Sequence, residues 1–119
     1  MSEKQSVLTW FDFAVTDERA SMNFYKNLFD WEFQPYGSNY WVIKTNGKGI
    51  GAIRKDDTFT PVQGFTPYFS IISISSGIKK ILDNNGTLIG DTTSIGAEGF
   101  FQNFHDLDGN LIALWSMVK

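Results

Sequence analysis

Asp12 and His105 are the two acid–base candidates that we weigh in this sequence, and both lie on expected strands. Imidazole titrates near neutrality without perturbation, so His105, the single histidine, is a candidate general base or ligand contact. It ends an expected strand beside a tight turn, where an exposed or turn-stabilising histidine is the simpler interpretation. His105 is therefore a catalytic candidate only if the protein is an enzyme.

Asp12 shares a strand face with Trp10 and Ala14, because successive side chains of a strand point to opposite faces. Partial desolvation raises the pKa of a carboxyl group, which could then serve a ligand as acid, base or hydrogen-bond acceptor. The alternative is a carboxylate paired with a Lys, Arg or Tyr of a neighbouring strand. Asp17, five residues further on, is expected to cap a helix.

The composition excludes several other chemistries. The absence of cysteine removes thiolate nucleophiles, disulfides, Cys-ligated zinc and iron–sulfur clusters, and one histidine leaves little for an imidazole metal site. Ten Lys and Arg against 13 Asp and Glu, a formal charge of −3, give no basic stripe for nucleic acid or an anionic membrane. No export signal or long apolar run is visible, so we expect a cytoplasmic protein without nucleic-acid or membrane partners.

The elements that must position these side chains begin with a strand over residues 7–15. Thr16, before two acidic residues, predicts the N-cap of an amphipathic helix that runs to about Phe29. Asn46-Gly47 is a tight hairpin signal. Three further strands are expected at residues 30–35, 40–45 and 49–53.

The second half repeats that order after a connection over residues 54–64 that is rich in turn formers. The pattern predicts a strand, a helix and three strands at 67–73, 75–82, 87–89, 99–105 and 111–117, with a helix stop at 84–86 and a loop over 90–98. We therefore expect one α+β domain over residues 1–119, with two tandem βαβββ modules at about 7–53 and 65–117.

Two stretches carry a resemblance to a known family. The run from Trp10 to Asp17 leads into Phe24-Tyr25 and Phe29-Asp30-Trp31, and the final turn reads Asp106-Leu107-Asp108-Gly109-Asn110. Residues 7–117 thereby resemble the vicinal oxygen chelate superfamily, which contains glyoxalase I, bleomycin resistance proteins, fosfomycin resistance proteins and extradiol dioxygenases. Asp30 replaces the glycine and Leu107 the proline of the family pattern. The resemblance implies curved sheets around a cleft, and together with the aromatic surplus it suggests a homodimer.

The resemblance also implies where a metal would be held. Metal-dependent members place ligands, usually His, His and Glu, on the first, fifth and eighth strands, and the corresponding positions here are Trp10, Thr66 and Ala113. An indole and a methyl group offer no lone pair to a divalent cation, and a lone hydroxyl is a poor ligand. We therefore expect neither the family's metal site nor another cofactor.

Aromatic side chains are expected to line the cleft instead, since four Trp, four Tyr and 11 Phe exceed what a core of this size needs. Strand alternation leaves open whether Tyr40 or Trp41 faces inward. The expected ligand contacts are Trp10, Asp12, Trp41, Thr66, Tyr68, Ser70, Phe101, His105, Ala113 and Trp115.

These observations favour a metal-independent protein that binds a small aromatic or amphipathic molecule in an aromatic-lined cleft. One alternative is a metal-independent lyase or isomerase that uses Asp12 or His105 as acid or base. A metal-dependent glyoxalase or dioxygenase fits least, because the three corresponding positions lack donors. The sequence leaves the identity of the ligand open.

Overall fold

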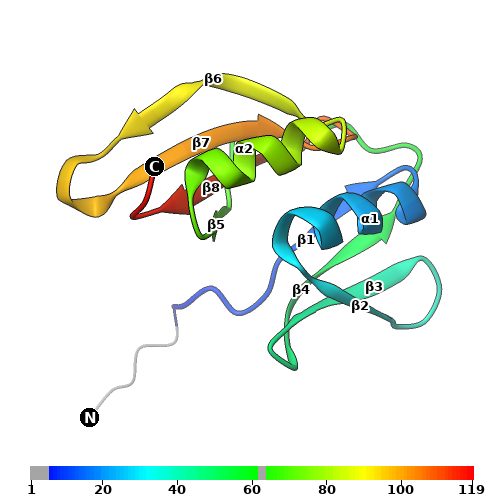
Figure 1. Ribbon diagram of the computed structural model, residues 1–119. Coiled ribbons are helices and arrows are strands. Elements are labelled where there is room, and N and C mark those ends of the chain that lie inside the picture. The colour runs from blue at the N-terminus through cyan, green and yellow to red at the C-terminus, as the bar shows by residue number, and fades with distance from the viewer. Residues whose placement is uncertain (1–5, 62–63) are drawn as a thin grey trace, which may run out of the picture.

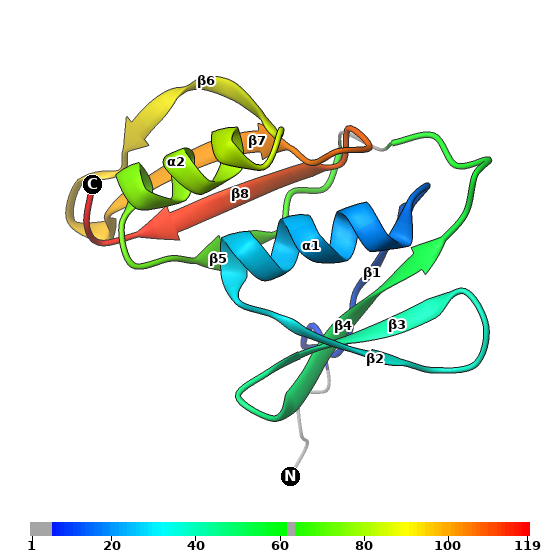
Figure 2. The same ribbon diagram turned by 45° about the vertical axis from the view of Figure 1, so that its right-hand side comes forward.

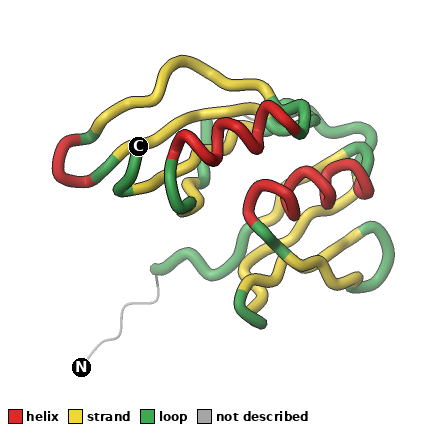
Figure 3. Tube along the Cα trace, viewed as in Figure 1, coloured by secondary structure: helices red, strands yellow, loops and turns green. Residues whose placement is uncertain are grey.

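The computed structural model describes residues 6–61 and 64–119, and it contains two four-stranded sheets, each with its own α-helix (Figures 1 and 3). The strand orders are β1-β4-β3-β2 and β5-β8-β7-β6, so the second half repeats the first with every strand in the same place. The outer strands β1 and β5 each pair in parallel with the last strand of their module, and the other pairs are antiparallel. The predicted α+β fold of two βαβββ modules is confirmed.

The first module contains four strands and one helix: β1 (Asp12–Val15), α1 (Glu18–Phe29), β2 (Glu32–Pro35), β3 (Tyr40–Thr45) and β4 (Lys48–Lys55). β1 is shorter than the predicted 7–15 because β4 pairs with it only through residues 52–55. For the same reason residues 54 and 55, expected in the connection, belong to a strand.

The N-cap of α1 lies one residue later than predicted. The side chain of Asp17 accepts a hydrogen bond from the Ala20 amide at 3.1 Å, as the capping interpretation of Asp17 required. Thr16 donates both its amide and its hydroxyl to Asp108 of the other module and is therefore not the cap.

The second module contains four strands, one α-helix and one 3₁₀ turn: β5 (Tyr68–Ser70), α2 (Ile74–Asp83), β6 (Thr87–Ser94), η1 (Gly96–Glu98), β7 (Phe100–His105) and β8 (Leu111–Ser116). The predicted loop over 90–98 is wrong in its first half, since β6 continues to Ser94 across an irregular register. Gln102 permits this because its buried amide donates to the carbonyl oxygens of Ile89 and Gly90 and accepts from Thr92.

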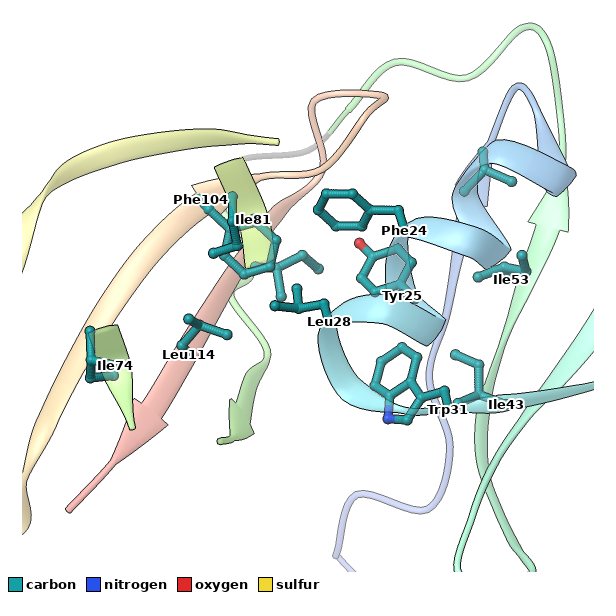
Figure 4. Close-up of a cluster of buried hydrophobic side chains, with 12 residues drawn as sticks. Phe24, Tyr25, Leu28, Trp31, Ile43, Ile53, Ile74, Ile81, Phe104 and Leu114 are labelled. Carbon is teal, nitrogen blue, oxygen red and sulfur yellow. The ribbon is translucent and has the colours of Figure 1, made fainter. Parts of the chain in front are cut away.

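The two helices contact each other where the modules meet, and one hydrophobic core joins the two modules (Figures 2 and 4). Phe24 of α1 packs against Phe104 of the second sheet, with ring centroids 6.2 Å apart. Phe69 of β5 packs in turn against Trp31 at 4.9 Å. The modules therefore form one packed unit. Within the described residues, no helix is long and apolar enough to cross a membrane.

A buried polar turn also fastens the second module to the first. Asp106 accepts hydrogen bonds from the Tyr25 hydroxyl at 2.7 Å and the Asn110 amide at 3.0 Å, while Asn110 donates to the Ala14 carbonyl oxygen at 2.9 Å. Asp108 accepts from Thr16. We call residues 106–110 the latch turn, and its family-like sequence is explained by these contacts between the modules.

The latch turn contains two perturbed titratable groups. Burial raises the pKa of the Asp106 carboxyl above its ordinary value, and hydrogen bonds from Tyr25 and Asn110 oppose that rise. Burial, and next the charge of Asp106, raises the pKa of Tyr25 well above its ordinary value. The tyrosine therefore stays protonated and remains a donor to Asp106.

Candidate functional site

Each sheet has one face packed against the core and one face turned away from it. In the first sheet Phe13 contacts Tyr25 of α1, so the alternate residues Asp12 and Ala14 lie on the opposite face. In the second sheet Phe104 and Leu114 are fully buried in the core, so their neighbours along each strand lie on the opposite face. We call these outer faces the first and second open faces.

The first open face carries a network of polar side chains that satisfy one another. Trp10 donates its indole N–H to the Tyr40 hydroxyl at 3.0 Å, and that hydroxyl donates to Asp12 at 3.3 Å. Arg54 pairs with Asp12 through Nε at 3.3 Å and with Asp56 through Nη1 at 3.1 Å. Hydrogen bonds from the Thr58 amide and hydroxyl, followed by the Arg54 contact, lower the pKa of Asp56.

This network decides between the two interpretations of Asp12. Its carboxylate is paired with an Arg and a Tyr of neighbouring strands, and its side chain is 36% exposed. Such a group is not the desolvated carboxylate that an acid–base role at this position would need. The paired alternative is the one observed.

Tyr40, and not Trp41, lies on the first open face. Tyr40 pairs with Arg54 in the register of β3 and β4, whereas Trp41 pairs with the buried Ile53 and packs against the core. The expectation that Trp41 contacts a ligand is therefore wrong, because the β3 register turns its side chain toward the core.

The second open face brings together most of the other predicted residues. In the strand registers Tyr68 and Asn103 flank Ala113, while Ser70 and Phe101 flank Trp115. The rings of Tyr68 and Phe101 meet edge to face, with centroids 5.8 Å apart. Trp115 donates its indole N–H to the Glu98 carbonyl oxygen at 2.8 Å, which fixes the ring over η1. The result is a sheet face covered by aromatic side chains.

His105 and Thr66 lie at the margin of this face. His105 ends β7 opposite Thr87 and Leu111, and alternation with Asn103 places it on the second open face. Thr66 precedes β5 and is half-buried. Both residues are therefore near the position predicted for them.

Two cavities lie elsewhere on the described part of the chain. One, of about 210 Å³, follows the seam between the modules and includes Asp12, Arg54, Phe59 and Phe65. The other, of about 720 Å³, lies between the end of α1 and β5 and includes Ser70. Of the predicted ligand contacts, Asp12 lines the first cavity and Ser70 the second.

The residues at the expected ligand positions do not fit the family's metal ion. Ala113 offers only a methyl group and is fully buried, and Trp10 uses its N–H on Tyr40. Among residues 6–61 and 64–119, no three His, Cys, Asp or Glu side chains are grouped closely enough to hold an ion.

Known proteins resemble this chain in sequence at a low level. The sequence matches no established family profile. It is 26% identical, over 121 residues, to the "Putative glyoxylase CFP32" of Mycobacterium tuberculosis and of Mycobacterium bovis, covering 94% of this chain. That match covers 46% of each relative, so the chain spans about half the length of the curated relatives it matches.

Solved structures with the same architecture include the fosfomycin resistance protein FosX of Listeria monocytogenes, at 20% identity and a TM-score of 0.77, with 94% of this chain and 93% of that chain covered. A mutant of the same protein, complexed with Mn(II) and 1S,2S-dihydroxypropylphosphonic acid, gives a TM-score of 0.78, 20% identity and coverage of 98% and 93%.

A glyoxalase/bleomycin resistance protein/dioxygenase family enzyme of Burkholderia phytofirmans has a TM-score of 0.74 at 14% identity, with 90% and 95% covered. The chain therefore has the fold of the vicinal oxygen chelate superfamily. The resemblance inferred from its motifs is confirmed at that level.

Two site features were missed by the sequence reasoning. Arg54 was assigned to a connection, yet it pairs with Asp12 across the sheet. Asn103 was not among the predicted residues, although its alternation with the core residue Phe104 could have placed it on this face.

Proposed function

We propose that this chain is a small-molecule binding protein of the glyoxalase/bleomycin resistance type, which holds an aromatic or amphipathic ligand without a metal ion. The observation that carries the proposal is the second open face, where the rings of Tyr68 and Phe101 meet edge to face and Trp115 lies beside Phe101 in the strand register. Aromatic walls of this kind bind flat apolar surface by burial and by edge contacts. The ligand's position would coincide with the face on which the resemblance places the family's metal.

The same reasoning supports a homodimer. Tyr68 is 54% and Trp10 is 40% exposed in a single chain, and both belong to open faces. Large aromatic side chains left on a surface commonly mark an interface or a ligand site. The curated relatives are about twice as long as this chain, which leaves room in them for a second unit of its size. We propose that a second copy covers part of the open faces and closes the ligand site.

Acid–base catalysis by Asp12 receives less support from the same geometry, because Asp12 is engaged by Arg54 and Tyr40, whereas catalysis by His105 stays an alternative. The cytoplasmic location expected from the sequence stays a prediction.

The test is an NMR titration of the ¹⁵N-labelled protein with anisole, once with EDTA and once with Mn²⁺. We expect the indole N–H signal of Trp115 to shift on addition of anisole, with the same dissociation constant in the EDTA sample as in the Mn²⁺ sample. The signals of Trp31 and Trp41, which pack in or against the core, should stay unshifted. Selective Mn²⁺ broadening around Ala113, or anisole binding that requires the metal, would overturn the metal-independent proposal. Static light scattering on the same sample is expected to give the mass of a dimer.

A further inference from the structure

Asn103 has a polar atom that the fold leaves without a partner. Among the described residues, its Oδ1 is the one buried side-chain nitrogen or oxygen without a hydrogen bond. Leaving a buried acceptor unpaired costs about 1–3 kcal/mol, so such atoms are rare and usually meet a water, an ion or a ligand. The position of this oxygen is therefore informative.

The repeat within the chain shows that the fold does not need an amide at this place. Asn103 pairs with Ala113 in the second sheet, and Val42 pairs with Ala52 in the equivalent strands of the first. The two alanines occupy matching positions, because β1 and β5 set Asp12 beside Ala52 and Tyr68 beside Ala113. A valine thus fills the position in one module that Asn103 fills in the other.

Two polar side chains of this sheet direct their N–H groups elsewhere. Trp115 uses its N–H on Glu98, and the buried amide of Gln102 is turned to Ile89, Gly90 and its own strand. The neighbours of Asn103 in the register, Ile89 and Ala113, are apolar. The acceptor consequently lies on an apolar, aromatic face with its hydrogen-bonding capacity unused.

We propose that Asn103 determines ligand specificity: its Oδ1 accepts a hydrogen bond from an O–H or N–H group on an aromatic ligand packed against Tyr68, Phe101 and Trp115. This inference rests on the proposed function and adds the chemical class of the ligand, an aromatic hydrogen-bond donor such as a phenol or an aromatic amine. A site built around a polar partner discriminates against ligands that lack it, because the buried group is then left unpaired.

The experiment compares two probes of similar shape, phenol and anisole, of which phenol alone can donate. Dissociation constants are measured by NMR titration of the full chain for the wild type, Asn103→Val, Asn103→Asp and Val42→Asn. The wild type is expected to bind phenol about 2- to 10-fold more tightly than anisole. Asn103→Val should bring this ratio to about 1 and leave the affinity for anisole unchanged.

The other two variants sharpen the result. Asn103→Asp keeps an acceptor without the N–H₂ group, so it should keep the preference for phenol. Val42→Asn places the same amide at the matching position of the first sheet, away from Tyr68, Phe101 and Trp115, and should leave the preference as in the wild type. The melting temperature of Asn103→Val should equal or exceed that of the wild type, since an unpaired polar atom has been removed.

Equal binding of both probes by the wild type, or a preference for phenol that survives in Asn103→Val, would overturn this inference and leave the proposed function standing. A preference lost in Asn103→Asp would overturn it as well, because the amide would then donate to the ligand. Failure of both probes to bind at millimolar concentration would contradict the proposed function, and this inference with it.

Discussion

The two open faces occupy equivalent places in the repeat, yet their side chains differ in one respect. On the first, Trp10, Tyr40, Asp12 and Arg54 are bonded to one another. On the second, the equivalents of Tyr40, Asp12 and Arg54 are Phe101, Tyr68 and Trp115, and the one amide among them, Asn103, has an unpaired oxygen. A face that satisfies its own polar groups has little to offer a ligand, whereas one that leaves an acceptor unsatisfied among aromatic rings is completed by one.

The largest expected effect concerns the latch turn, which fixes both faces in one unit. Asp106→Ala leaves the Tyr25 hydroxyl, the Asn110 side chain and two backbone amides without their acceptor. We expect the free energy of unfolding to fall by about 3 kcal/mol or more, measured by urea denaturation. Leu107→Ala, at an exposed position of the same turn, serves as the control and should cost under about 1 kcal/mol. Equal losses of unfolding free energy in the two variants would show that the hydrogen bonds of Asp106 do not stabilise the contact between the modules.

The next effect is on ligand affinity, and it distinguishes aromatic side chains of the second open face from those of the core. Trp115→Ala removes an aromatic wall, and we expect the affinity for anisole to fall about 10-fold. Trp41→Phe changes an aromatic side chain that packs against the core, and it should leave that affinity unchanged. If Trp41→Phe weakened binding as much as Trp115→Ala, the comparison of faces would fail.

A pH effect follows from the latch turn. Because the fold raises the pKa of Asp106, the folded state holds its proton more tightly than the unfolded state. The stability contributed by this group is therefore fully present below the ordinary carboxyl pKa and is lost as the pH rises through the raised value. Tyr25→Phe removes a hydrogen bond that opposes the rise, so the ¹³Cγ titration of Asp106 should move to still higher pH. An unchanged or lower midpoint would contradict this assignment.

Substitutions on the first open face should have little effect on stability or on ligand affinity. The Asp12–Arg54 pair is more than one-third exposed on both sides, and Arg54→Ala is expected to change the free energy of unfolding by less than about 1 kcal/mol. The affinity for anisole should stay at the wild-type value in the same titration. A loss of binding in this variant would place the ligand on the first face instead of the second.

The smallest effect concerns the end of α1. Asp30 has a left-handed backbone with φ of 59° and ends the helix, where glycine carries no Cβ strain and no unfavourable charge. Asp30→Gly is expected to raise the free energy of unfolding by up to about 1 kcal/mol, seen as a higher melting temperature. Ligand affinity serves as the control and should stay constant; a lower melting temperature would contradict the cap interpretation.

The sequence predicted the second open face better than the first, for a physical reason. Alternation is a local property, so Phe101 and His105 could be assigned to one face of β7, and Ala113 and Trp115 to one face of β8, while the family resemblance turned both faces toward the cleft. The pairing of Asp12 with Arg54 joins residues 42 positions apart, through a parallel strand pair that no local pattern reveals.

Two other features depended on tertiary contacts. Only the β3–β4 register determines which of Tyr40 and Trp41 faces the core. The extension of β6 depends on hydrogen bonds from the buried side chain of Gln102. The latch motif was recognised as a family-like turn, but its contacts with Tyr25 and Thr16 appear only when the modules are packed together.

The most direct test of the central claim is a set of intermolecular NOEs between phenol ring protons and the protein in a metal-free sample. Binding on the second open face predicts NOEs to the rings of Tyr68, Phe101 and Trp115. NOEs to Phe59 and Phe65 in their place would locate the ligand in the seam cavity and contradict the account.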